Sequence, residues 1–128
     1  MKSSPREDPM MSGRAMYFDK AGRPITIEEF VEKYEDDTYR TIGYDIDRDH
    51  GIAVSTVWLG VRMNLALFGP PLIFETMVFG APYEMERVRY CCEADAIEGH
   101  RRTVQDVLAG RPLWFSDDEE ADQDQETP

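Results

Sequence analysis

The sequence lacks disulfide pairs, long apolar runs and clusters of basic residues, and each absence argues against a class of protein. Among 128 residues the only cysteines are the adjacent Cys91 and Cys92. Neighbouring cysteines rarely pair with each other, so we expect two reduced thiols rather than a disulfide framework. The longest apolar runs are broken by Thr56, Arg62 and Glu75. None therefore approaches the roughly 18 apolar residues that indicate a membrane-spanning helix.

We also expect no secretory signal at the N-terminus. Lys2 and Arg6 could supply the positive charge of such a signal, but no apolar stretch follows them. Residues 1–14 are instead polar and without periodicity, which is typical of a disordered arm. We therefore expect a cytoplasmic protein that contacts no membrane.

The net charge of −12 is concentrated at the C-terminus, and no basic stripe balances it. Residues 116–128 contain seven acids and no base, so they carry −7 of the −12 and the rest of the chain carries −5. Such a run predicts a disordered acidic tail. Binding to nucleic acid needs basic side chains along the phosphates, so we expect no direct nucleic-acid binding.

An acidic segment resembles the start of a calcium-binding loop without completing it. Asp45, Asp47 and Asp49 occupy the first, third and fifth positions of such a loop. Glycine, however, stands at the seventh position rather than the sixth, and the twelfth residue is Thr56 rather than glutamate. The segment is better interpreted as an acidic hairpin turn.

Other chemical motifs are equally incomplete. His50, His100, Cys91 and Cys92 are residue types that bind zinc, but their spacing matches no known zinc motif. The same residue types occur in cysteine proteases, yet no motif connects them. We assign no catalytic residue, no cofactor and no metal. A small enzyme or ligand-binding module, with His50, Asp49 and the cysteines as its candidates, remains an alternative.

Periodicity predicts the secondary structure between the two ends. Residues 27–35 have apolar side chains at helical spacing after Thr26, a favoured N-cap residue. Residues 94–109 form a second apolar helical pattern that ends at Gly110, a favoured helix C-terminus. Apolar runs or period-two alternation predict strands at 15–18, 38–46, 52–60, 72–79 and 85–91.

These elements predict an α+β fold within one domain, residues 15–115. The sheet should be antiparallel with about four to five strands, and a short N-terminal helix and a longer C-terminal helix should pack on one face. Trp58 and Phe74 are expected at the centre of the core. The inward face of the sheet should comprise Ile42, Tyr44, Val54, Trp58, Phe74 and Val78, with Ile97 of the longer helix against it.

Two segments are candidates for an interaction surface. One is the apolar connection from Met63 to Pro71, which could instead fold onto the sheet. The other is the aromatic pair Trp114-Phe115 together with the acidic tail that follows it. The tail could bind a partner or could only improve solubility. The candidate residues are Leu65, Leu67, Phe68, Pro70, Trp114, Phe115, Asp117, Asp118, Glu119 and Glu120.

Two passages resemble a known group of sequences. They are Val54-Ser55-Thr56-Val57-Trp58-Leu59-Gly60 and the run from Gly69-Pro70-Pro71 to Gly80, followed by Arg89-Tyr90 and a helix that contains Gly99-His100. They are similar to small proteins of unknown function that are encoded by bacteriophages and prophages of actinobacteria. Cys92 stands where that pattern leads us to expect a capping threonine. The resemblance covers roughly residues 40–105 and implies a biological setting, but no activity or site residue.

Together these observations predict a non-enzymatic phage accessory protein. It would act by protein–protein interaction, as a host-modulating or anti-defence factor, on a host or phage protein. An alternative is an inhibitor of a nucleic-acid-binding host protein, in which the acidic tail competes for a basic surface. The sequence leaves the oligomeric state open.

Overall fold

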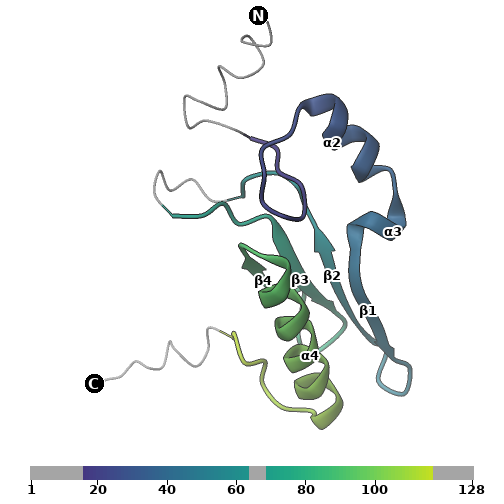
Figure 1. The fold of residues 1–128 in the computed structure, drawn as a ribbon. Coiled ribbons are helices and arrows are strands. Elements are labelled where there is room, and N and C mark those ends of the chain that lie inside the picture. Colours follow the sequence, from purple (N-terminus) through teal and green to yellow (C-terminus); the bar gives the residue numbers. More distant parts are fainter. Residues whose placement is uncertain (1–15, 64–68, 117–128) are drawn as a thin grey trace, which may run out of the picture.

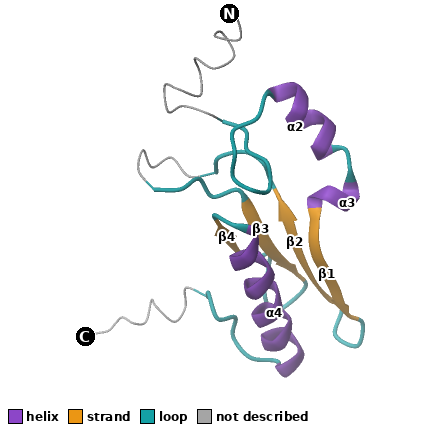
Figure 2. Ribbon diagram, in the orientation of Figure 1, coloured by secondary structure: helices purple, strands orange, loops and turns teal. Residues whose placement is uncertain are grey.

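The computed structural model describes residues 16–63 and 69–116 (Figure 1). These residues form a four-stranded antiparallel sheet in the order β1-β2-β3-β4, and α4 lies along one face of it (Figure 2). The predicted α+β class is therefore confirmed. The elements are α2 (Ile27–Tyr34), α3 (Asp37–Arg40), β1 (Thr41–Asp47), β2 (Ile52–Trp58), β3 (Phe74–Phe79), β4 (Arg87–Tyr90) and α4 (Glu93–Ala109). None of the helices in these two described stretches has the length and apolarity needed to cross a membrane.

A fifth strand is not formed by the described part of residues 15–18. Tyr17 and Phe18 make only single bridges, to Val61 and Pro24 respectively. Pro24 has no backbone N–H, so it cannot extend the pairing into a ladder. The strand expected from this apolar run is therefore replaced by a bent loop.

The helix ends follow the capping residues in the sequence. The Thr26 side chain accepts a hydrogen bond from the backbone N–H of Glu29, and the Glu29 carboxylate accepts one from the backbone N–H of Thr26. This capping box fixes the start of α2. Gly110 ends α4 in the left-handed conformation, with φ of 69°. Cys92 is the N-cap of α4, but its side chain makes no capping hydrogen bond.

The core lies between the sheet and α4, and its centre is where the sequence predicts it. Trp58 and Phe74 are completely buried, and they pair across β2 and β3. Residues 52, 54, 56 and 58 of β2 are buried, whereas the residues between them are partly exposed. Because side chains alternate along a strand, one face of the sheet meets α4 and the other does not.

Strand β1 differs from the sequence prediction at its start and in its inward face. Residues 38–40, expected in the strand, belong to the short helix α3. A bulge between Thr41 and Gly43 then places Gly43 opposite Thr56. Ile42 still packs against the core, but Tyr44 points to the other face and is 58% exposed. The prediction of an inward Tyr44 is wrong because the bulge changes the alternation.

Helix α4 is also rotated relative to the prediction. Ile97 is 55% exposed, whereas Ala96, Gly99 and Thr103 are buried against the sheet. The first part of this inward side is therefore made of small residues, which allow a close approach to the strands, whereas Asp106 and Val107 are buried nearer the end of the helix. Replacement of Ile97 by Asp places a carboxylate in solvent, so it should not unfold the protein, as it would if Ile97 faced the core.

Candidate functional site

The face of the sheet opposite α4 carries no described helix (Figure 2). The strand register aligns side chains on this open face in rows across neighbouring strands. Ile46, Ala53 and Phe79 form one row, and Tyr44 and Met77 flank Ser55 in the next. Ile46, Tyr44 and Phe79 are all exposed. This face therefore presents apolar side chains that no described helix covers.

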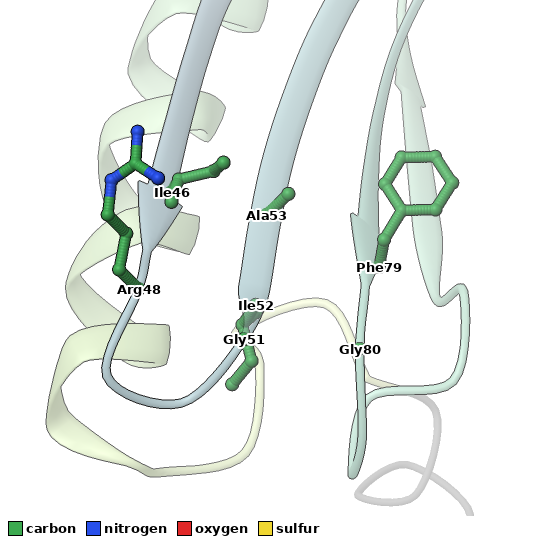
Figure 3. A pocket seen from close by; sticks show the side chains of 7 residues that line it. All are labelled: Ile46, Arg48, Gly51, Ile52, Ala53, Phe79 and Gly80. Atoms are coloured by element: carbon green, nitrogen blue, oxygen red, sulfur yellow. The ribbon is translucent and has the colours of Figure 1, made fainter.

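Side-chain size makes the open face a groove along β2. The small β2 residues Ala53 and Ser55 form the floor, and larger side chains stand beside them on β1 and β3. One end of the groove contains a hollow of about 410 Å³. Figure 3 shows Ile46, Ala53 and Phe79 side by side there, with α4 behind the sheet. The residues that line the hollow are Ile46, Arg48, Gly51, Ile52, Ala53, Phe79 and Gly80.

The charges beside this groove are mainly positive, although the chain as a whole is acidic. Arg87 and Arg89 lie on the β4 side, opposite Met77 and Glu75 respectively. The Glu75 carboxylate is 3.1 Å from Nε of Arg89 and 3.7 Å from Nε of Arg87. Arg48 lines the hollow at the other side. Three guanidinium groups therefore accompany one carboxylate, which favours an acidic binding partner.

A chain of hydrogen bonds crosses the other face of the sheet, beneath α4. His100 Nε2 lies 2.7 Å from the Asp45 carboxylate, and His100 Nδ1 lies 2.7 Å from the hydroxyl of Thr56. The hydroxyls of Thr56 and Thr76 are 2.5 Å apart, and the Tyr90 hydroxyl donates to that of Thr76 at 2.8 Å. With a neutral imidazole, donation can run in one direction from Tyr90 to Asp45, so each hydroxyl donates once.

The order of aspartate, histidine and threonine is that of a nucleophilic triad, but the hydroxyl is inaccessible. Thr56 has no exposed surface, and its oxygen already contacts Thr76 and His100. A nucleophile must reach a substrate carbonyl or phosphorus, which this hydroxyl does not do in this structure. The bonds instead satisfy buried polar groups and connect α4 to β1, β2 and β3.

Sequence reasoning missed both the groove and this hydrogen-bond chain. The residues that the sequence predicted for an interaction surface lie elsewhere. Pro70 is exposed. Trp114 and Phe115 are half-buried and pack on the two core clusters, and Arg102 stacks on the Trp114 ring. Ser116, the first residue of the expected tail, is buried. The remaining candidates, Leu65, Leu67, Phe68, Asp117, Asp118, Glu119 and Glu120, lie outside the described residues.

The side chains considered for metal binding are only partly brought together. In the described stretches, Cys91, Cys92 and Asp95 have ligand atoms within 4.8 Å of one another. Burial and the neighbouring Cys92 raise the pKa of the Cys91 thiol, which opposes the thiolate form that metals bind. Asp45 and Asp47, by contrast, turn to His100 and His50 respectively. The arrangement supports neither a calcium loop nor a four-ligand zinc site.

No protein-family model matches this chain, and no curated protein or solved structure matches it. The sequence did show one feature of the open face, since Met77 and Phe79 alternate with the buried residues of β3. An apolar residue on each side of a strand indicates that both faces of the sheet need a covering partner.

One surface pair provides a prediction on pH. His50 Nδ1 lies 2.9 Å from the Asp47 carboxylate, and this hydrogen bond raises the pKa of His50 and lowers the pKa of Asp47. Because the pKa of His50 is higher in the folded than in the unfolded protein, protonated His50 stabilises the fold at pH values below its unfolded pKa of 6.5. This contribution is lost as the pH rises through the folded pKa. In an NMR titration, Asp47→Asn should therefore lower the His50 midpoint.

A neighbouring acid provides the control for this titration. Asp49 also raises the pKa of His50, but through a weaker electrostatic effect than the hydrogen bond to Asp47. Asp49→Asn should consequently move the midpoint less than Asp47→Asn does. Equal shifts in the two variants would contradict the hydrogen bond as the main cause.

Proposed function

We propose that this protein is a non-enzymatic accessory protein that binds a helix of a partner protein in the groove of its open sheet face. The observation that carries the proposal is the groove itself, with its small floor, large apolar walls and adjacent arginines. Exposed apolar surface of this kind is costly in water and marks interaction sites in soluble proteins. Arginine and aromatic side chains are also enriched in protein interfaces.

The width of the groove suits an α-helix. Its walls stand on β1 and β3, which are separated by two inter-strand spacings, or about 9.5 Å. A helix with its side chains is about 10–12 Å wide, so it would rest on the walls with one row of its side chains reaching the floor. The opposite face of the same sheet already accommodates α4. A helix in the groove would complete a second layer and shield the apolar rows from water.

The chemistry of the groove defines the partner helix. Its contacting side should carry apolar residues at positions i, i+4 and i+7, the spacing by which helices dock in grooves. Its flanks should carry Asp or Glu beside Arg87 and Arg89. The resemblance to actinobacterial phage proteins supports a setting in the bacterial cytoplasm during phage growth. There the partner would be a host or phage protein with an acidic amphipathic helix.

A designed peptide tests this function directly. The probe is an acidic helix with leucine at i, i+4 and i+7, and its control is a peptide of identical composition with the leucines distributed around the helix. The designed peptide should bind in a fluorescence anisotropy titration, and its affinity should fall as salt screens the arginines. Ala53→Glu, which places bulk and negative charge on the groove floor, should weaken binding at least tenfold.

Matched variants separate the groove from general effects. Ile97→Asp adds the same charge at an exposed position of α4, so it should leave the affinity unchanged. Ser55→Glu, in the next row of the floor, should repeat the effect of Ala53→Glu if that variant folds poorly. Equal affinity of the two peptides, or of Ala53→Glu and the unaltered protein, would refute a helix-binding groove.

A further inference from the structure

Helix α2 is a second apolar surface that is only partly covered in the described chain, where Arg40 and Phe30 contact the Tyr34 ring. None of its residues is buried, although Phe30 contacts the ring of Trp58 at its inner side. Ile27, Val31 and Tyr34 are between 44% and 51% exposed. They stand at positions i, i+4 and i+7, so they form one continuous apolar stripe. Figure 1 shows α2 beyond one end of the sheet, away from α4.

The charges of α2 complement those of the groove. At 100° per residue, Glu28 and Glu32 fall along the edge of the stripe that contains Val31. Helix α2 therefore combines an exposed apolar stripe with an acidic flank. The groove combines an apolar floor and walls with three arginines, Arg48, Arg87 and Arg89, of which the last two share the single carboxylate of Glu75. These are the features that the proposed function requires of the bound helix and of its receptor.

We infer that a second copy of this chain supplies the helix, and that α2 of one molecule docks in the open-face groove of another. This inference rests on the proposed function, since it names the occupant of the same groove. The acidic tail fits less well, because residues 117–128 contain Ala121 and Pro128 as their only apolar side chains. Direct contact between two open faces would bring arginines against arginines and leave both α2 stripes exposed.

The contact joins α2 of one molecule to the groove of another, so the two surfaces differ. It forms a closed dimer only if each molecule places its α2 in the groove of the other. Otherwise it propagates from molecule to molecule. Eight residues of helix span about 12 Å, which buries less than a standard protein interface. We therefore expect weak association, with a dissociation constant in the micromolar range, that depends on salt. Sedimentation velocity over a hundredfold range of concentration, up to roughly 1 mM, detects affinities of this order.

Two variants in different molecules provide the decisive experiment. Val31→Lys alters the stripe but leaves the groove intact, and Ala53→Glu alters the groove but leaves the stripe intact. Each variant alone should sediment as a monomer, with its dissociation constant raised at least tenfold. An equimolar mixture should associate more strongly than either variant alone, because the unaltered helix of one variant meets the unaltered groove of the other in one contact per pair. Ile97→Asp is the matched control and should associate like the unaltered protein.

Each other outcome overturns the inference. If Val31→Lys alone still associates, the contact does not use α2. If the mixture stays monomeric while the unaltered protein associates, the two surfaces do not meet each other. If the unaltered protein is monomeric throughout, the second copy is not the occupant. Association or peptide binding only after deletion of residues 1–15 or 117–128 would identify an end of the same chain as the occupant.

The designed acidic peptide separates failure of this inference from failure of the proposed function. Suppose that the protein does not self-associate, but that the peptide binds the unaltered protein and does not bind Ala53→Glu. The groove then binds a helix of another protein. If neither occurs in the full chain, the groove has no helix-binding role and both conclusions fail. Circular dichroism of Val31→Lys and Ala53→Glu confirms that each variant is folded before its sedimentation is interpreted.

Discussion

Truncation of Trp58 to alanine should lower the free energy of unfolding by about 3–5 kcal/mol, the usual cost of removing a fully buried tryptophan. Trp58 has no exposed surface, and its indole N–H donates to the backbone carbonyl of Phe18 at 3.0 Å. Its ring also meets Tyr39 edge-on at 4.9 Å. The substitution would therefore create a cavity and leave the Phe18 carbonyl without its buried donor. Chemical denaturation of the two proteins measures the difference.

The second tryptophan is the control for this substitution. Trp114 also donates its indole N–H, to Thr103 at 3.0 Å, but it is only half-buried. Trp114→Ala should therefore cost clearly less than Trp58→Ala. Since a domain of this size has a total stability of roughly 5–15 kcal/mol, Trp58→Ala should also lower the melting temperature strongly. A loss below about 1 kcal/mol for Trp58→Ala would show that this residue is not at the centre of the core.

The sequence was sufficient to predict the antiparallel sheet, the two main helices and the central pair Trp58 and Phe74. These features depend on local signals, namely the Thr26 capping box, the glycine after α4 and the apolar runs of β2 and β3. Each signal acts over a few residues, so it can be recognised without knowledge of the fold. The predicted helix boundaries consequently agree with α2 and α4 within one residue.

The rotation of α4 and the face of β1 depend on distant contacts, so local patterns mispredicted them. Ile97 lies on a plausible apolar stripe, but the small side chains of Ala96 and Gly99 allow the helix to approach the strands more closely on their side. The bulge at Ile42 cannot be read from alternation, because it inserts one residue into an otherwise regular pattern. In both cases packing against the sheet overrides the periodicity of the segment.

Neither the groove nor the hydrogen-bond chain was predicted from the sequence. The groove requires knowledge that β2 lies between β1 and β3, with its small residues at the floor. The hydrogen-bond chain joins Asp45 to His100 and Thr56 to Thr76, pairs that are 55 and 20 residues apart. No spacing rule identifies such pairs. The predicted candidates came from loops and from the acidic tail, where exposure can be inferred from composition alone.

Replacement of Gly99 by alanine should destabilise the protein, although helix propensity predicts the opposite. Within a helix, alanine is favoured over glycine by about 1 kcal/mol. A methyl group at Gly99, however, would lie 2.2 Å from the hydroxyl oxygen of Tyr90 and 2.4 Å from its ring. Either α4 must move away from the sheet or Tyr90 must move, which breaks its 2.8 Å hydrogen bond to Thr76. Overpacking of this kind costs about 1–3 kcal/mol.

A change at Tyr90 should reverse the sign of this effect. Tyr90→Leu removes the hydroxyl and the ring atoms that the new methyl group would meet. In that background Gly99→Ala should raise the free energy of unfolding, because only the gain in helix propensity remains. The four proteins form a double-mutant cycle whose coupling energy measures the contact. Gln105→Ala, at an exposed position of α4, controls for propensity alone. If Gly99→Ala stabilised the protein with Tyr90 intact, α4 could not lie as close to β4 as it does here.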